Sequence, residues 1–267
     1  MKADRITGDI RTTLRHDSAH KHVAGSAVYV DDIPTTDDTL VVLIGQSPHA
    51  HARITGMDLS AVAAADGVVA VLTHADIPGV NDCSPVYGDD PVLAEGEVGY
   101  VGQAVFAIVA ETMRAARDAL PLANVSYETL PAILTIDEAM KAGSWLGPSV
   151  TMESGSPDAA LAGAKYMLSG RIEIGGQEHF YLEGQAALAI PGEDRDMTLH
   201  CSTQHPSEIQ HKVADCLGLS NHAVTVETRR MGGAFGGKES QGNLPAILSA
   251  LAAHVTGRPA KTVYDRD

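Results

Sequence analysis

The most distinctive stretch of the chain is Arg229-Arg230-Met231-Gly232-Gly233-Ala234-Phe235-Gly236-Gly237-Lys238-Glu239-Ser240-Gln241, in which four of thirteen residues are glycine. Apolar and polar residues alternate over 223–229, which predicts a half-buried strand, and the apolar run 243–254 predicts a helix. A glycine-rich loop between a strand and a helix presents backbone N–H groups near the positive end of a helix dipole. The stretch therefore predicts a site for an anionic or oxo-bearing ligand.

Two other interpretations of the glycine stretch stay open. Gly232, Gly237 and Lys238 match a phosphate-binding P-loop at every position except the last, where that motif needs a Ser or Thr hydroxyl for Mg²⁺. Glu239 stands there instead, and its carboxylate would repel phosphates unless it replaced the hydroxyl as a metal ligand. The second interpretation is a glycine turn with Phe235 packed into the core.

Composition limits the class of protein. The 267 residues carry 34 Asp and Glu against 19 Lys and Arg, a formal net charge of −15, so nucleic acid and anionic membranes are not expected partners. The three cysteines show no C-x-x-C spacing and predict neither a zinc site nor a disulfide framework. Residues 1–10 lack a signal-peptide core, and no apolar run approaches the roughly 20 residues of a membrane span. A cytoplasmic protein is expected.

Residues 1–142 are predicted to form a first domain of mixed strands and helices. The domain is followed by a linker at 143–165, where the chain becomes rich in Gly, Ser and Pro. Short apolar or alternating runs predict strands at 40–46, 67–73, 98–110 (interrupted at Gly102) and 125–130; helices are predicted at 59–65 and from 111 to near Pro121.

The second domain, 166–267, is predicted to be α+β. Strands are expected at 166–175, 185–190, 197–202, 223–229 and 260–265, and helices at 206–217 and 243–254. Glu178, His179 and Glu183 offer an acid–base cluster, but on a strand they do not converge, and a polar strand that braces the domain is the alternative. Paired histidines, His49 with His51 and His20 with His22, leave open a metal site or ordinary polar histidines.

Three motifs occur in a fixed order: 176–183, Ser202-Thr203-Gln204 and the glycine stretch; residues 47–54 add a fourth. Through these motifs the chain resembles the molybdenum-binding subunits of the xanthine dehydrogenase and aldehyde oxidase family, from about residue 20 to the end. The resemblance implies an α+β fold, in which an α/β hammerhead-like domain precedes the beginning of a molybdopterin-binding domain. Gly184 and Ala234 depart from the residues common in the family without removing a functional side chain.

The family resemblance implies a function and a set of site residues. The complete enzyme would hydroxylate purines, converting hypoxanthine and xanthine to urate with oxygen from water. Glu239 would be the catalytic residue that orients the purine, and its carboxylate favours a purine over an aldehyde. Gln204 would hydrogen-bond an oxo ligand of the molybdenum, while Phe235 and Gly236 would border the metal's outer ligands. None of these residues would ligate the metal directly.

Cofactors and partners follow from the same resemblance. Molybdopterin would bind this subunit, while a 2Fe-2S and FAD subunit would pass electrons to NAD, in a complex of two heterodimers. The family's subunit continues well past residue 267, so the chain is expected to be an N-terminal fragment that is inactive alone. The alternatives are another molybdenum hydroxylase, acting on aldehydes or other heterocycles, and a cofactor-free scaffold or interaction module.

Overall fold

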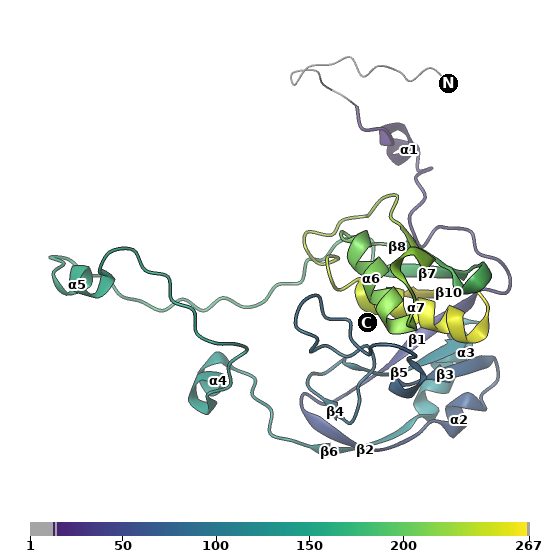
Figure 1. Cartoon of the computed structure of the whole chain (residues 1–267), viewed down its shortest axis with the longest axis horizontal. Coiled ribbons are helices and arrows are strands. Elements are labelled where there is room, and N and C mark those ends of the chain that lie inside the picture. The colour runs from purple at the N-terminus through teal and green to yellow at the C-terminus, as the bar shows by residue number, and fades with distance from the viewer. Residues whose placement is uncertain (1–12, 14, 266–267) are drawn as a thin grey trace.

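A seven-stranded sheet dominates the computed structural model, which describes residue 13 and residues 15–265 (Figure 1). Residues 1–10, on which the expected lack of a signal peptide depends, lie outside the described part. The strand order is β3 (Val68–Leu72), β5 (Ala104–Ala110), β1 (Leu40–Gln46), β10 (Ala260–Val263), β7 (Ala186–Pro191), β8 (Met197–Cys201) and β9 (Val224–Glu227). Both predicted domains contribute strands, so one sheet runs through them.

The two halves of this sheet meet at β10. This strand runs parallel to β1, with Leu40 opposite Ala260, and antiparallel to β7, with Ala260 opposite Ala189. A loop of the first half adds a second connection, because the Gly79 and Val80 amides donate to the Cys216 and Asp215 carbonyls. The division into domains at 1–142 and 166–267, with a linker at 143–165, stays a prediction. In the structure, strands from both predicted domains form one continuous sheet.

Strand β5 lies at the centre of the first half and is buried along its whole length. Its side chains alternate between two cores: Ala107 and Val109 face the larger one, and Phe106 and Ile108 face the smaller. The smaller core is closed by a three-stranded sheet, β4 (Glu97–Val98), β2 (Ala52–Asp58) and β6 (Asn124–Thr129), with helices α2 (Ser60–Ala63) and α3 (Met113–Ala119). Short 3-10 turns occupy His74–Asp76 and Leu120–Leu122.

Helices α6 (Pro206–Leu217) and α7 (Asn243–Thr256) cover the second half, with 3-10 turns at Glu193–Arg195 and Asn221–Ala223. The predicted stripe of α6 is buried at Ile209, Val213 and Leu217, and Gly218 ends the helix in the left-handed conformation. Helix α7 is buried from Pro245 to Ala253 because it packs on β7 and β10. No described helix combines the length and apolar composition that crossing a bilayer requires.

Residues 131–183 form an extended arm that leaves the body after β6 and returns before β7 (Figure 1). It carries the short helices α4 (Ile136–Ala142) and α5 (Pro157–Ala162), and nearly all of its residues are exposed. Near the N-terminus, α1 (Ala19–Val23) is also exposed. The strand predicted at 166–175 is wrong, because no strand in the described part of the chain pairs with that part of the arm. The polar strand considered for 176–183 is also not formed, whereas the helices and strands predicted at the other ranges have counterparts.

Candidate functional site

The glycine loop, residues 232–239, joins the end of β9 to the start of α7. Gly233 and Gly236 have φ values of +98° and +95°, which favour glycine, and Phe235 also has a positive φ of 53°. A Cβ on Gly237 would lie 2.7 Å from a ring atom of Tyr181, and one on Gly232 would lie 2.5 Å from the Glu183 Cβ. Two glycines thus serve backbone conformation and two serve close packing.

Gln204 ends the β8 segment and reaches the loop. Its Oε1 accepts hydrogen bonds from the Gly236 amide at 3.0 Å and from the Lys238 amide at 3.4 Å, and its own backbone N–H donates to the Lys238 carbonyl at 2.8 Å. Because the oxygen must face these donors, the orientation of the side-chain amide is fixed. The Nε2 group has no protein acceptor among the described residues and, because Gln204 is exposed, it can donate to water or to a ligand.

The structure gathers three of the predicted site residues, Gln204, Phe235 and Gly236, on the exposed side of the loop. The Phe235 side chain is 77% exposed, so it does not plug the core as the alternative interpretation required. Glu239 is exposed at the end of the same loop. The Gly236 N–H already donates to Gln204, so it is not one of the free backbone N–H groups that the glycine stretch was expected to present to an anionic ligand.

Lys238 points away from the exposed side and is completely buried. Its Nζ lies 2.9 Å from Glu183 Oε2 and 2.8 Å from Ser202 Oγ, and 4.7 Å above the Tyr181 ring. A P-loop lysine must reach the phosphates of its ligand. The P-loop interpretation is therefore wrong for this chain. Sequence reasoning missed the ion pair because nothing in the spacing of Glu183 and Lys238 indicates that they meet.

The 176–183 segment is an irregular extended stretch and not the expected strand. Phe180 has a φ of 50°, and the Glu178 carboxylate accepts a short hydrogen bond from the Phe180 amide. Tyr181 and Glu183 both face the loop, while His179 lies close enough to Gly237 that a Cβ there would be 2.8 Å from its Nδ1. Glu178 is turned to its own backbone, so the three groups do not form an acid–base cluster.

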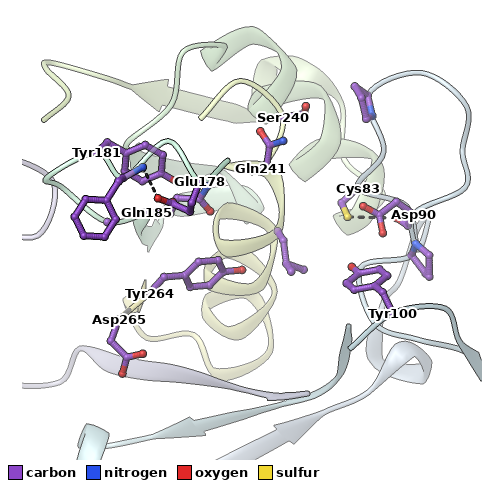
Figure 2. A pocket seen from close by; sticks show the side chains of 15 residues that line it. Cys83, Asp90, Tyr100, Glu178, Tyr181, Gln185, Ser240, Gln241, Tyr264 and Asp265 are labelled. Carbon is purple, nitrogen blue, oxygen red and sulfur yellow. Dashed lines mark hydrogen bonds between the residues drawn. The ribbon is translucent and has the colours of Figure 1, made fainter. Parts of the chain in front are cut away.

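A cavity of about 770 Å³ lies beside the loop, between the two halves (Figure 2). Residues of the first half, among them Cys83, Asp90 and Tyr100, face Gln185 and Tyr264 of the second. Burial raises the pKa of Asp90, and burial raises that of Tyr100 to about 12. Among the residues that the structure describes, the titratable lining is Asp90, Glu178 and Asp265 with cysteine and tyrosines, and includes no Lys, Arg or His. An anionic cofactor group is disfavoured in such surroundings.

The candidate metal residues lie apart. His51 Nδ1 is 2.7 Å from the Pro131 carbonyl oxygen and its Nε2 is 3.0 Å from Glu97, while the His49 ring packs on Tyr127. His20 and His22 lie on helix α1, where a spacing of two does not place side chains on one face. No group of three or more His, Cys, Asp or Glu side chains within the described ranges could hold a metal ion.

All three cysteines are buried and free. Burial raises the pKa of Cys201 and Cys216 to about 12, and burial also raises that of Cys83. The thiols therefore stay protonated and unreactive near neutral pH.

Comparison with protein families divides the chain into two matched parts. Residues 24–131 match the hammerhead domain of aldehyde oxidases and xanthine dehydrogenases, and residues 143–267 match the molybdopterin cofactor-binding domain. Among curated proteins, the chain is 41% identical to xanthine dehydrogenase/oxidase of Mus musculus over 255 residues, and 38% identical to aldehyde oxidase 4 of the same species. Each alignment covers 95% of this chain and 19% of the relative. The chain thus spans about a fifth of their length.

Solved structures share the fold. Quinoline 2-oxidoreductase from Pseudomonas putida 86 superposes with a TM-score of 0.81 at 25% identity, over 96% of this chain and 34% of that one. The aldehyde oxidoreductase from Desulfovibrio gigas gives a TM-score of 0.82 at 25% identity, over 93% of this chain and 29% of that one. The expected α+β architecture, a hammerhead domain followed by part of a molybdopterin-binding domain, is confirmed.

Proposed function

This chain belongs to the xanthine dehydrogenase and aldehyde oxidase family of molybdenum hydroxylases, and from that membership we propose that it supplies part of the molybdopterin site of a purine-hydroxylating enzyme. Gln204, Phe235 and Gly236 would contact the cofactor, and Glu239 would orient the purine. The electron path inferred from the resemblance, a 2Fe-2S and FAD subunit that reduces NAD in a pair of heterodimers, belongs to the same proposal, as does a cytoplasmic location.

The observation that carries the proposal is the fixed orientation of the side-chain amide of Gln204. Two loop N–H groups hold its oxygen, so the Nε2 donor is presented at the exposed side next to Phe235 and Gly236. A donor in a fixed position suits an oxo ligand, which only accepts hydrogen bonds. The residues present therefore fit the outer ligands of a molybdenum centre, whose chemistry when bound is to take two electrons from the substrate carbon. None of these three residues lines the acidic cavity, so the anionic part of the cofactor is not assigned to that cavity.

The purine substrate depends on Glu239. Its exposed carboxylate can accept hydrogen bonds from ring N–H groups of a purine, whereas an aldehyde carries no N–H group to match. Overall similarity does not discriminate between these substrates, because the identities to the xanthine dehydrogenase and to the aldehyde oxidase differ by only three points, 41% against 38%.

The cofactor part of the proposal is tested by metal content. The chain is produced in cells that make molybdopterin, then purified and analysed for molybdenum and for pterin fluorescence after oxidation. We expect bound molybdenum in the wild-type chain and its loss in Gln204→Leu. Gln46→Leu, a change of the same kind at an exposed position of β1, is the control and should keep the metal. A wild-type chain without molybdenum would favour the scaffold alternative.

The substrate part is tested in a chimera. This chain replaces the matching segment of the mouse xanthine dehydrogenase/oxidase, and turnover of hypoxanthine and of an aromatic aldehyde is measured with Glu239 and with Glu239→Val. Loss of a required hydrogen-bonding partner should reduce kcat/KM for hypoxanthine at least about 100-fold and leave the aldehyde nearly unchanged. Equal effects on both substrates would remove the argument for a purine.

A further inference from the structure

We infer that Lys238 and Glu183 are a positioning pair, which fixes the two ends of the glycine loop so that Gln204 and Gly236 hold their ligand-facing geometry. The identity of that ligand rests on the proposed function, but the positioning of the loop does not. Neither side chain reaches the exposed side, so both act through the residues they hold.

Glu183 holds the first residue of the loop from both directions. Its Oε2 accepts from the Gly232 amide at 2.7 Å, and its own amide donates to the Gly232 carbonyl at 3.2 Å. The same oxygen accepts from Ser202 Oγ at 2.7 Å and from Lys238 at 2.9 Å, whereas Oε1 is buried without a described hydrogen-bond partner. The carboxylate charge is therefore balanced chiefly by one ammonium group.

Lys238 holds the other end. The backbone carbonyl of Lys238 accepts from the backbone N–H of Gln204 at 2.8 Å and from Thr203 Oγ1 at 3.2 Å. The backbone N–H of Lys238 donates to the side-chain oxygen Oε1 of Gln204. Its Nζ meanwhile is fixed by Glu183, Ser202 and the face of Tyr181. A shift of the lysine side chain would therefore move the backbone to which Gln204 is attached.

Energetics also favour a positioning role. A buried ion pair is weak evidence for stability, because desolvation of both charges offsets most of their attraction, and an apolar pair of similar volume often serves equally well. What an apolar pair cannot reproduce is the hydrogen bond from Gly232 to the carboxylate and the bond from the ammonium to Ser202. The pair thus differs from a packing residue in the geometry that it imposes on the loop.

The experiment is amide hydrogen exchange, measured by NMR on the cofactor-free chain. In Lys238→Met, the amides of Gly232, Gly236 and Lys238 should exchange at least about tenfold faster relative to the β5 amides, because the bonds that protect them lose their anchor. The double variant Lys238→Met with Glu183→Leu removes both charges. It should regain most of the stability lost in the single variant while its loop amides still exchange fast.

The matched control is Lys212→Met. Lys212 forms a mostly buried ion pair with Asp82, 2.6 Å between Nζ and Oδ2, with side chains 17% and 13% exposed, and no described hydrogen bond or ion pair joins it to the loop. In Lys212→Met, the exchange rates of the loop amides and of the β5 amides should change by the same factor. The inference is overturned if loop exchange in Lys238→Met also follows β5, or if the double variant restores slow loop exchange.

The same samples separate this inference from the proposed function. Fast loop exchange in Lys238→Met, with no molybdenum in the wild-type chain, would support the positioning pair and reject the cofactor site. Unchanged loop exchange, with molybdenum bound to the wild-type chain, would reject the positioning pair and support the cofactor site.

Discussion

The glycine loop and the arm are both irregular, but the loop is anchored by buried side chains whereas most of the arm is exposed. Loop residues 232–239 have two glycines packed against neighbours and both ends tied to buried side chains. Arm residues 131–178 are nearly all exposed, and their described ion pairs, such as Arg171 with Asp137, stay within the arm; only the end of the arm, at Glu183, pairs with the loop. The arm is the more apolar segment, with exposed side chains such as Trp145, Leu146 and Leu168. Order in an irregular segment therefore depends on buried partners and not on composition.

Removal of the carboxylate that anchors the loop should have the largest effect on this contrast. Glu183→Ala leaves Lys238 charged and buried without its counterion, which should lower the free energy of unfolding by about 3–5 kcal/mol. Glu173→Ala breaks an exposed ion pair with Arg171 in the arm and should cause no measurable change. Urea unfolding followed by circular dichroism compares the two. Similar losses would mean that the arm is held as firmly as the loop.

A methyl group on a loop glycine should have the next largest effect. In Gly232→Ala the new Cβ would lie 2.5 Å from the Glu183 Cβ, so backbone must shift, at a cost of about 1–3 kcal/mol. Gly170→Ala in the arm meets no atom within 4 Å and should leave thermal unfolding unchanged. A harmless Gly232→Ala would show that the loop has room to move.

A change in the arm should act only locally. Thr135 caps helix α4 by accepting from the Glu138 amide, and Thr135→Ala should destabilise that helix by about 1 kcal/mol. Because α4 buries no residue, the global free energy of unfolding should stay the same. Amide exchange over 136–142 should rise while exchange in β5 does not. A matching fall in global stability would show that the arm is coupled to the body.

The smallest effect is expected at the root of the arm, where His51 meets the Pro131 carbonyl and Glu97. The hydrogen bond to Pro131, followed by that to Glu97, raises the pKa of His51 above its usual 6.5. Because the folded pKa is raised, the stabilisation is fully present below the unfolded pKa and is lost as pH rises through the folded one. An NMR titration should show a raised midpoint that falls in Glu97→Gln. An unchanged midpoint would exclude the Glu97 contact.

The sequence predicted the elements whose partners are close along the chain or whose pattern is strong. The stripe of α6 and its terminal Gly218 were both correct, because helix periodicity and the left-handed cap are local properties. The strand at 166–175 was wrong, because alternation reports a strand only if a neighbouring strand is present to pair with it. The shared sheet was likewise not predicted, since no local pattern indicates that β10 lies beside β1.

The sequence grouped the candidate site residues, but it did not predict the buried ion pair beneath them. The resemblance located Gln204 and the glycine loop together, and the structure brings them within hydrogen-bonding distance, although the roles of Gln204, Phe235, Gly236 and Glu239 stay predictions. The burial of Lys238 was not foreseen, because a lysine beside glycines suggests a ligand contact and its counterion is 55 residues away. Long-range pairs of this kind follow from the fold and leave no spacing signal.

The central position of β10 has a consequence for how the chain folds. One group of sheet strands, β3, β5 and β1, can form from the first 110 residues, and another, β7, β8 and β9, from residues 186–227. The two groups cannot form one sheet until residues 260–263 are made, because β10 lies between them and its pairing with β1 spans more than two hundred residues. Closure over so long a separation is slow. During synthesis, β1 and β7 would have unpaired edges until β10 is made, and an unpaired edge can pair with a wrong strand.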